Sequence, residues 1–544
     1  MANAKFNLNM PANETVKSYA PDTPERKIIK EKLHELKNRQ VEIPLIIGGK
    51  EVRTGNLGKC VLPHNHGALM GTYHMAGKKE IQMAIEASLK ISQKWAMMEW
   101  HERASIFLKA AEILAGPWRS LLNASTMLCQ SKNVFQAEAD AACELIDFLR
   151  FNTFYASQIY ENQPPISSAG TWNRLEYRPL EGFIFTAAPF NFTSIAGNLA
   201  SAPAIMGNVV LWKPASNAVY SAYFLMKLFE EAGIPDGVIN FIPGFGEEIG
   251  PLIMKSPDLA GIHFTGSTRI FQNMWETVGN NIRIYKNYPR IVGETGGKDF
   301  VFAHKDTGIE ELGTALIRGA FEYQGQKCSA ASRAYIPRSI WPELQGFVLK
   351  ELKTVKMGDV EDFSNFINAV IDKTAFDKIT QYIEFIKSSN EAEILYGGNY
   401  DDTKGYFIEP TVAATTNPHF RTMEEEIFGP ILTIYIYEDN SFEETLHLCD
   451  TTSPYGLTGS IFSRNREAIS AAEKILVNAA GNFYINDKPA GAIVGQQPFG
   501  GSRASGTNDK AGSMLNMIRW VTPRTIKETF SPPTDYRYPF MAKE

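Results

Sequence analysis

A thiol and a carboxyl group, each set among small residues, form the most reactive combination in this sequence. Cys328 lies in the run Gly-Gln-Lys-Cys-Ser at 325–329, and Glu294 lies in the run Gly-Glu-Thr-Gly-Gly at 293–297. Glycine allows close approach of the backbone and leaves neighbouring side chains uncovered. The positive charge of Lys327 is expected to lower the pKa of the adjacent thiol from its usual value of about 8.5. These residues predict a cysteine nucleophile and a carboxylate base.

The pair predicts a definite chemistry on an aldehyde. A thiolate at Cys328 would attack the carbonyl carbon and leave a tetrahedral adduct with a negatively charged oxygen. Asn191, in the run Pro-Phe-Asn at 189–191, and the backbone N–H of Cys328 are candidate donors to that oxygen. The adduct could then lose hydride to a nicotinamide, and water activated by Glu294 would release the acid. The sequence therefore favours aldehyde oxidation, with Cys328, Glu294 and Asn191 as catalytic residues.

Composition is that of an ordinary globular protein with more than one domain. A chain of 544 residues exceeds what one core normally holds, so two or three domains are expected. The net charge is −6 with both signs mixed along the chain, which argues against nucleic acid or an anionic membrane as a partner. The five cysteines form no C-x-x-C pair and no cluster with histidine. We therefore expect neither a metal site nor a disulfide framework, and we favour a reducing compartment.

One uncharged stretch, residues 182–212, is long enough to raise the question of a membrane span. Two prolines and three asparagines interrupt it, and each would be costly in lipid. We expect a buried strand, a loop and a helix of small residues instead. The first residues of the chain lack the apolar core of a signal peptide. The prediction is a cytoplasmic protein, or a protein of the mitochondrial matrix if the cell is eukaryotic.

The elements that position these residues alternate in type. Residues 79–160 are mostly helical by their apolar spacing, with a break at Gly116-Pro117. Strands are predicted at 208–212, 238–242 and 261–264, and a helix at 216–232, ended by Gly233. Such a series indicates a doubly wound parallel sheet. Gly266 and Ser267 follow the last of these strands and precede a helix, where backbone N–H groups could meet a phosphate.

Six short motifs resemble those of the aldehyde dehydrogenase family. They are Pro-Phe-Asn at 189–191, Lys-Pro-Ala at 213–215, Phe-Thr-Gly-Ser at 264–267, Gly-Glu-Thr-Gly-Gly-Lys at 293–298, Gly-Gln-Lys-Cys at 325–328 and Glu-Ile-Phe-Gly-Pro at 426–430. The resemblance implies an α/β fold with three parts. These are a doubly wound parallel-sheet NAD-binding domain at 1–152 and 180–290, a second α/β catalytic domain at 291–500, and a β-hairpin and tail for oligomerisation at 153–179 and 521–544.

NAD is the cofactor that this resemblance implies. The residues implied to bind it are Ala188, Lys213, Ser216, Gly266, Ser267, Glu426 and Phe428. Lys213 would contact the adenosine ribose, Ser267 the pyrophosphate and Glu426 the nicotinamide ribose. Ser216 stands where NAD-preferring members often carry an acidic residue. Repulsion of a 2′-phosphate is then lost, so some use of NADP becomes possible. NAD is still the preferred cofactor that the resemblance implies.

Within the family, the resemblance narrows to the 1-pyrroline-5-carboxylate dehydrogenases. Lys-Cys-Ser at 327–329 and the runs 482–488 and 495–501 carry this likeness. It implies NAD-dependent oxidation of L-glutamate γ-semialdehyde to L-glutamate through a cysteine thiohemiacetal and a thioester, the second step of proline degradation. The chain has no room for a proline dehydrogenase domain, so that enzyme would be a functional partner on a separate chain.

The same resemblance implies a set of substrate residues. They are Glu144 for the α-ammonium group, Phe192 and Phe499 along the aliphatic chain, and Lys327, Ser329, Gly491 and Ala492 as donors to the α-carboxylate. Core packing is the alternative for the two phenylalanines. Ala492 replaces a serine that the family commonly has, so one hydroxyl contact is missing and a weaker site is expected.

The C-terminal tail predicts self-association. Its aromatic residues Phe530, Tyr536, Tyr538 and Phe540 would be an exposed liability in a monomer. In the family, such a tail and a β-hairpin build the subunit interface, which the stretches 163–177 and 525–540 would supply here. A homodimer or larger homo-oligomer is expected, with an intramolecular wrap as the alternative.

Two other functions stay open at this point. One is an aldehyde dehydrogenase for another semialdehyde, such as that of succinate or methylmalonate, which the residues around Cys328 disfavour. The other is a non-catalytic relic of the fold. A relic should have lost at least one of Cys328, Glu294 or Asn191, and all three are present.

Overall fold

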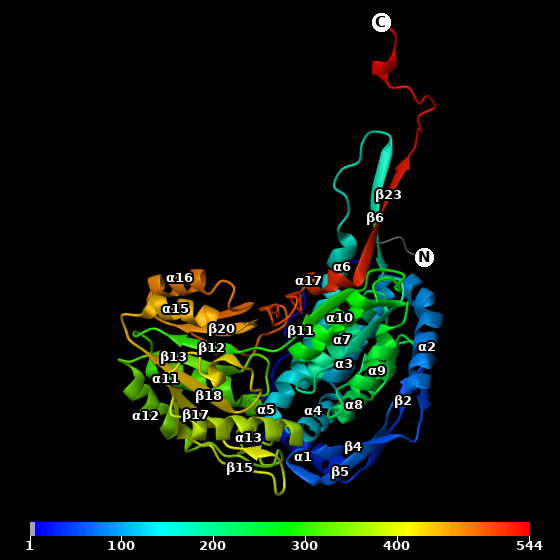
Figure 1. Cartoon of the computed structure of the whole chain (residues 1–544). Coiled ribbons are helices and arrows are strands. Elements are labelled where there is room, and N and C mark those ends of the chain that lie inside the picture. Colours follow the sequence, from blue (N-terminus) through cyan, green and yellow to red (C-terminus); the bar gives the residue numbers. More distant parts are fainter. Residues whose placement is uncertain (1–5) are drawn as a thin grey trace.

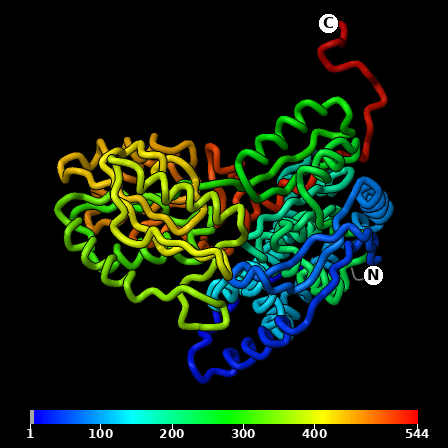
Figure 2. The backbone as a smooth tube through the Cα atoms, turned by 60° about the horizontal axis from the view of Figure 1, so that its bottom comes forward, coloured from blue at the N-terminus to red at the C-terminus, as the bar shows by residue number. Residues whose placement is uncertain are grey.

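The structure is a computed structural model that describes residues 6–544. Two seven-stranded sheets, each packed against helices, form its two main lobes (Figure 1). A two-stranded ribbon stands out from one lobe, and the C-terminal tail continues beyond it (Figures 1 and 2).

The first sheet contains the strands predicted from the sequence. Its order is β11 (Arg290–Glu294), β10 (Leu259–Thr265), β7 (Phe183–Ala187), β8 (Val209–Lys213), β9 (Ile239–Phe241), β2 (Leu45–Ile47) and β3 (Lys50–Val52). The first five run parallel, while β2 and β3 are antiparallel to their neighbours. Every residue of β7 and β10 is buried, as expected of central strands. The doubly wound parallel sheet is thus confirmed.

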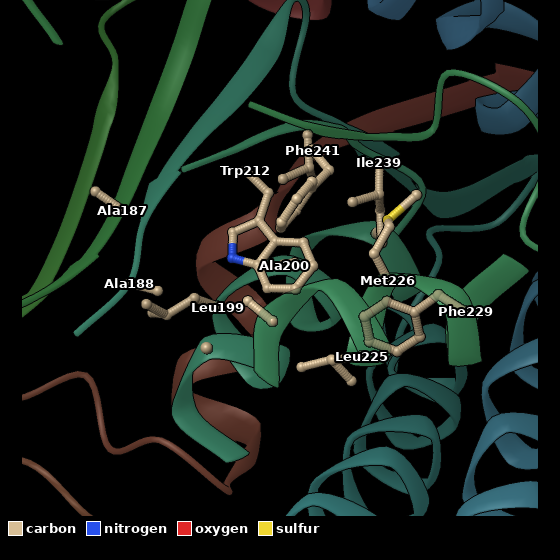
Figure 3. Packing of buried hydrophobic residues seen from close by; sticks show 14 of the residues in the cluster. Ala187, Ala188, Leu199, Ala200, Trp212, Leu225, Met226, Phe229, Ile239 and Phe241 are labelled. Atoms are coloured by element: carbon tan, nitrogen blue, oxygen red, sulfur yellow. The ribbon is translucent and has the colours of Figure 1, made fainter. Parts of the chain in front are cut away.

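Helices α7 (Thr193–Ile205) and α8 (Val219–Ala232) pack against this sheet. Trp212 of β8 lies against Phe229 of α8 and Phe241 of β9, with ring centroids 6.4 and 5.3 Å apart (Figure 3). Helix α8 begins at Val219 and not at 216 as predicted, and it ends at Gly233, whose φ of 100° favours glycine. Parallel strands end at a common edge, so the loops after β7, β8 and β10 come together.

The helical region predicted from apolar spacing lies next to this sheet. It comprises α2 (Lys78–Met97), α3 (Trp100–Ala115), α4 (Arg119–Gln130), α5 (Val134–Ala137), the π-helix η1 (Glu138–Glu144) and α6 (Leu145–Glu161). Helix α3 ends at Gly116, where the break was predicted. The π-helix was not predicted, because apolar spacing does not distinguish it from an α-helix. Such turns often occur at functional sites.

The second sheet forms the other lobe. Its order is β14 (Ala392–Tyr396), β17 (Thr411–Thr415), β18 (Ile431–Tyr437), β13 (Ala331–Pro337), β12 (Asp299–Ala303), β20 (Thr458–Phe462) and β21 (Asn482–Ile485), and only β14 with β17 is antiparallel. Helices α11 (Ile309–Phe321), α12 (Trp341–Leu352), α13 (Lys373–Ser388), α15 (Phe442–Thr451) and α16 (Arg466–Ile475) belong to this lobe (Figure 1). The second α/β unit is therefore present, while the exact division of the chain into domains stays a prediction.

The ribbon joins two segments that are far apart in the sequence. Strand β6 (Thr171–Pro179) pairs antiparallel with β23 (Val521–Thr529) over their full lengths. The expected hairpin is therefore completed by the tail strand, and residues 153–161 belong to α6. The tail beyond β23 extends away from the body (Figure 2), and its aromatic side chains are exposed, with 84% of Phe540 accessible. The intramolecular wrap is not seen.

The remaining α-helices and strands are between 2 and 14 residues long. They are α1 (Pro24–Lys37), β1 (Val41–Ile43), β4 (Leu57–Leu62), β5 (Asn65–His74), α9 (Gly246–Met254), α10 (Thr268–Asn280), β15 (Tyr400–Asp401), β16 (Phe407–Ile408), α14 (Arg421–Glu424), β19 (Tyr455–Gly456), β22 (Ser502–Arg503) and α17 (Met514–Met517). The uncharged stretch 182–212 folds into β7, a loop, α7 and β8, as predicted. Among residues 6–544, no helix is long and apolar enough to cross a membrane.

Candidate active site

Cys328 lies in the loop between a short 3-10 helix, η2 (Glu322–Gly325), and strand β13. The backbone from 323 to 325 is left-handed, with a φ of 66° at Gly325. A β-carbon on Gly325 would collide with the carbonyl oxygen of Gly429, so glycine is required where the two loops meet. This turn brings Cys328 out of the core, and it is the one cysteine of the five that is not fully buried.

Two cavities meet at Cys328. One has a volume of about 440 Å³ and is lined in part by Gly266 and Gly296; we call it the glycine-rich cavity. The other has a volume of about 340 Å³ and is lined by many acidic and basic side chains; we call it the charged cavity. Among the residues that line them, Cys328 is the one that the two cavities share. Two molecules bound on opposite sides could therefore reach the same sulfur atom.

The glycine-rich cavity contains most of the residues predicted to hold a cofactor. Its lining includes four of those seven residues, Gly266, Ser267, Glu426 and Phe428, together with the catalytic candidate Asn191. Ser267 lies two residues after the end of β10 and is the N-cap of α10. The first turn of a helix leaves backbone N–H groups without helical partners, which suits a phosphate group.

Glu426 forms one wall of this cavity. Its Oε1 atom accepts a hydrogen bond from the backbone N–H of Gly297 at 2.9 Å. A β-carbon on Gly296 would lie 2.5 Å from the other carboxyl oxygen, so glycine at 296 makes room for this carboxyl group. Phe428, with a φ of 63°, packs edge to face with Phe190 at 5.8 Å. A carboxyl group and two aromatic rings therefore lie in the same wall as Cys328.

Three of the predicted cofactor residues lie outside this lining. Lys213 ends β8 and its Nζ atom donates to the carbonyl oxygen of Pro214 at 3.1 Å. Ser216 donates to the carbonyl oxygen of Gly244 at 3.3 Å, and the N–H of Ala188 donates to the carbonyl oxygen of Lys213 at 3.0 Å. Burial lowers the pKa of Lys213 to about 8. These residues are near one another at the ends of β7 and β8, and their cofactor roles stay predictions.

Asn191 is buried in the loop between β7 and α7. Its Nδ2 atom donates to the carbonyl oxygen of Gln326 at 3.0 Å, two residues before Cys328. An amide nitrogen carries two N–H groups, so the second one is available to an oxygen atom next to the sulfur. Asn191 and Cys328 line the same cavity, which is the arrangement that an oxyanion donor requires.

Glu294 is the last residue of β11 and lines neither cavity. Its Oε2 atom accepts a hydrogen bond from the backbone N–H of Gly501 at 3.1 Å. Burial raises its pKa well above the usual value, while this hydrogen bond and the charge of Lys510 act in the opposite direction. A base with a raised pKa takes up a proton more readily near neutral pH.

The expected effect of Lys327 on the thiol is wrong. Burial raises the pKa of Cys328 well above its usual value, and the nearby carboxyl groups of Asp299, Glu426 and Glu294 raise it further. Lys327 lies in the charged cavity, where its Nζ atom donates to Glu322 at 3.0 Å. Glu322 compensates the charge of Lys327 there. Although Lys327 is adjacent to Cys328 in the sequence, its side chain lines the charged cavity. Cys328 is therefore a protonated thiol at neutral pH.

The charged cavity contains the whole set of predicted substrate residues. They are Glu144, Phe192, Lys327, Ser329, Gly491, Ala492 and Phe499. The two phenylalanines lie at a cavity wall and not wholly in the core. Their individual roles stay predictions.

Glu144 ends the π-helix η1 and accepts a hydrogen bond from the Ser194 hydroxyl at 2.8 Å. Burial, and next the negative charge of Asp140, raises its pKa to about 8. Asp140 is paired with buried Lys132 at 2.6 Å. Within residues 6–544, no cation lies within ion-pair distance of Glu144, and the same holds for Asp147 of this cavity. A bound cation would stabilise the charged form of Glu144.

Another part of the lining of the charged cavity carries positive charge. Glu322 accepts from Lys327 at 3.0 Å and lies 3.9 Å from Lys488. Two ammonium groups thus face one carboxylate. Lys488 also donates to the carbonyl oxygen of Ala490 at 2.8 Å. An anionic group bound here would balance the remaining charge.

Gly491 and Ala492 begin a loop that reaches to residue 497 in the same wall; we call residues 491–497 the anchor loop. Gly491 is left-handed with a φ of 96°. Within residues 6–544, the backbone N–H groups of Gly491 and Ala492 donate to no hydrogen bond. Adjacent unpaired N–H groups can bind a carboxylate, which agrees with the predicted use of this loop.

Several residues of the charged cavity were not predicted. They are Asn13, Glu14, Asp140, Asp147, Glu322 and Lys488. Asp140, Glu144 and Asp147 recur along one helical segment, and this spacing of acidic residues was a usable signal. Asn13 and Glu14 gave no such signal, because they lie far from the rest of the site in the sequence.

A search of family models matches residues 53–522 to the aldehyde dehydrogenase family. This match covers most of the chain, so the chain belongs to the aldehyde dehydrogenase family. The fold described above is that of this class, and the resemblance seen in the motifs is confirmed.

Among its relatives, the chain is similar to a mitochondrial delta-1-pyrroline-5-carboxylate dehydrogenase of Dictyostelium discoideum. The two are 53% identical over 540 residues, which cover 99% of this chain and 97% of the relative. The structure of the Mycobacterium tuberculosis delta-pyrroline-5-carboxylate dehydrogenase bound with NAD has a TM-score of 0.96, 49% identity and full coverage of both chains. Proline utilization A of Bdellovibrio bacteriovorus matches with a TM-score of 0.91 and 28% identity, over 96% of this chain and 53% of that protein.

Proposed function

We propose that this chain is an NAD-dependent dehydrogenase that oxidises L-glutamate γ-semialdehyde, the open form of 1-pyrroline-5-carboxylate, to L-glutamate. The observation that carries the proposal is the place of Cys328 in the walls of both cavities. A cofactor in the glycine-rich cavity and a substrate with charged groups in the charged cavity would meet at this sulfur. The names of its relatives at about half identity support the same substrate.

The residues of the glycine-rich cavity fit NAD. Glycine at 296 leaves space beside Glu426, and the N-terminus of α10 at Ser267 suits a pyrophosphate. Glu426 would accept from a ribose hydroxyl, and Lys213 would donate to the second ribose. Ser216 brings no negative charge to the ribose site, so it does not by itself exclude NADP. NAD, when bound, supplies the hydride acceptor that converts a thiohemiacetal into a thioester.

The first step forms a bond between Cys328 and the aldehyde carbon. The thiol loses its proton to a base, the sulfur attacks, and the carbonyl electron pair moves onto the oxygen. Asn191 and the backbone N–H of Cys328 donate to this oxyanion. Because the pKa of Cys328 is raised, the thiolate must be generated at the moment of attack, by Glu294 or by water.

The second step releases the product. Glu294 takes a proton from a water molecule, and the oxygen of that water attacks the thioester carbon. The C–S bond then breaks and returns the sulfur of Cys328, while the acid leaves. The raised pKa of Glu294 makes it a stronger base for this proton transfer than an exposed carboxylate.

The charged cavity supplies the substrate contacts in this proposal. Glu144 faces the α-ammonium group, and Lys327, Ser329 and the N–H groups of Gly491 and Ala492 face the α-carboxylate. Phe192 and Phe499 border the aliphatic carbons. These contacts lie several bonds from the reacting carbon, so they provide binding energy without altering the chemistry at the sulfur.

A substrate comparison tests the proposal. NADH formation is followed by absorbance with 1-pyrroline-5-carboxylate, succinate semialdehyde and propanal, using Cys328→Ala as the control. The expected result is the highest kcat/KM for pyrroline carboxylate and no NADH with Cys328→Ala. A higher kcat/KM for succinate semialdehyde would identify another semialdehyde as the substrate. No turnover of any aldehyde would identify a relic of the fold.

We also propose a homo-oligomer, a functional partner and a location. The exposed aromatic tail beyond the β6–β23 ribbon supports a homodimer or larger homo-oligomer, and light scattering of the full chain and of a chain ending at 529 tests it.

A proline dehydrogenase on a separate chain would supply the substrate. The five unpaired thiols support a reducing compartment, the cytoplasm or, in a eukaryotic cell, the mitochondrial matrix.

A further inference from the structure

An N-terminal segment closes the charged cavity, far from the rest of the site in the sequence. We call residues 13–19 the strap. Asn13, Glu14 and Val16 of the strap line the charged cavity together with the anchor loop and Glu144. The strap has no regular secondary structure, so its position must come from side-chain contacts with the body.

Partly buried ion pairs fix the strap to the helices. Glu14 accepts from Arg119 at 2.6 Å and from Arg150 at 2.8 Å. Buried Glu138, which also pairs with Arg119, accepts from the N–H of Lys17 and from the hydroxyl of Tyr19, each at 2.8 Å. Charge-assisted hydrogen bonds of this kind are strong when shielded from water. The strap is therefore an ordered part of the cavity wall.

Asn13 connects this fixed strap to the anchor loop. Its Nδ2 atom donates to Asp147 at 2.8 Å and to the carbonyl oxygen of Val494 at 2.7 Å. Its Oδ1 atom accepts from the side chain of Gln496 at 2.8 Å. Both N–H groups and the carbonyl oxygen of one amide are thus used. Two of these three hydrogen bonds hold the anchor loop, at Val494 and Gln496. Both residues follow closely after Gly491 and Ala492 in the sequence.

We propose that Asn13 is a positioning residue that holds the anchor loop so that the N–H groups of Gly491 and Ala492 bind the α-carboxylate of the substrate. This inference rests on the proposed function. Asn13 does not touch the reacting atoms. It acts through Val494 and Gln496, and the strap thereby determines selectivity for an aldehyde that carries an α-carboxylate. An aldehyde without that group gains nothing from the anchor loop.

The test compares two asparagines near the N-terminus, Asn13 in the strap and Asn9 before it. Asn13→Ala removes all three contacts, while Asn9→Ala changes an exposed asparagine that makes no hydrogen bond within residues 6–544. We expect Asn13→Ala to raise the KM for pyrroline carboxylate and the Ki for glutamate about tenfold, which is the effect of losing about 1.4 kcal/mol of binding free energy. Its kcat, its KM for NAD and its kinetics with propanal should stay within twofold of the wild type, as should all constants of Asn9→Ala.

Two further measurements separate positioning from general damage. Gln496→Ala removes one of the same contacts from the exposed side of the loop, and it should raise the same two constants by a smaller factor and add little to Asn13→Ala. Amide hydrogen exchange at 491–497 should be faster in Asn13→Ala and unchanged in Asn9→Ala. An equal loss with propanal and pyrroline carboxylate, or an unchanged Ki for glutamate, would overturn the proposal. Wild-type enzyme that oxidises propanal and neither oxidises pyrroline carboxylate nor binds glutamate would instead overturn the proposed function.

Discussion

The carboxyl group of Glu294 accepts a hydrogen bond from the backbone N–H of Gly501 at 3.1 Å, which ties the end of one sheet to a loop that follows the other. The same carboxyl group is close enough to Cys328 to raise the pKa of its thiol. The proposed base therefore lies near the proposed nucleophile, although it lines neither cavity.

Replacing Glu294 by glutamine should separate the two halves of the reaction. Glutamine keeps an oxygen that can accept from Gly501 but has no basic carboxylate, so attack and hydride transfer should continue while water is not activated. We expect a burst of about one NADH per active site and an acyl adduct on Cys328 in intact-protein mass spectrometry. Absence of both the burst and the adduct would show that Glu294 also removes the proton of the thiol.

Alkylation of Cys328 should depend steeply on pH. Burial and nearby carboxyl groups raise the pKa of this thiol, and the reactive form is the thiolate. Below the pKa, the thiolate fraction grows about tenfold for each pH unit. The rate of iodoacetamide labelling at Cys328, measured by peptide mass spectrometry, should therefore rise about tenfold between pH 7 and pH 8. Cys143→Ala, which changes the buried cysteine at the charged cavity, serves as the control. A rate that is flat across this range would contradict the raised pKa.

Two glycine-to-alanine changes should affect different properties: one should weaken cofactor binding, and the other should stabilise a helix. In Gly296→Ala the new β-carbon would lie 2.5 Å from Glu426, so the carboxyl group must shift and the cofactor should bind at least tenfold more weakly. In Gly346→Ala the new β-carbon meets nothing within 4 Å inside helix α12, and alanine should stabilise that helix by about 0.5–1 kcal/mol. NAD titration by fluorescence and thermal unfolding measure the two effects. Equal NAD affinity in both variants would place the cofactor elsewhere.

Glutamate binding should strengthen as pH rises toward 8. Burial raises the pKa of Glu144 to about 8, so at pH 7 this carboxyl group is mostly protonated and must lose a proton to pair with the α-ammonium group. The Kd for glutamate should then fall by up to about tenfold per unit below pH 8 and level off above it. Asp147 changes its charge near pH 6, mainly below this range.

Two controls isolate the contribution of Glu144. Glu144→Gln should weaken glutamate binding and remove its dependence on pH between 7 and 8. Glutarate has the two carboxylates of glutamate without the ammonium group, so its Kd should not fall over this range in the wild type. Calorimetry in buffers of different ionisation enthalpy should also detect about one released proton per glutamate near pH 7. The same pH dependence in Glu144→Gln would assign the proton to another group.

Much of the chemistry could be read directly from the sequence. Cys328 and Glu294 lie among small residues in short motifs, and the alternation of apolar runs with Gly and Pro breaks defines the parallel sheet. These features are local, because the geometry of a turn or a strand restricts the residues within a few positions of it. The uncharged stretch at 182–212 was correctly divided into strand, loop and helix for the same reason.

The tertiary structure decided which charge acts on which group. Lys327 is adjacent to Cys328 in the sequence, yet it pairs with Glu322 in the charged cavity, while burial and other carboxyl groups set the pKa of the thiol. Asn13 meets Val494 across 481 residues, and Arg174 of β6 meets Glu528 of β23 across 354 residues. Burial and long-range contacts depend on how the whole chain packs, and no local pattern of residue types encodes them. The sequence by itself therefore determined the reactive groups and the type of fold, and the packing of the chain determined their protonation and the walls of the two cavities.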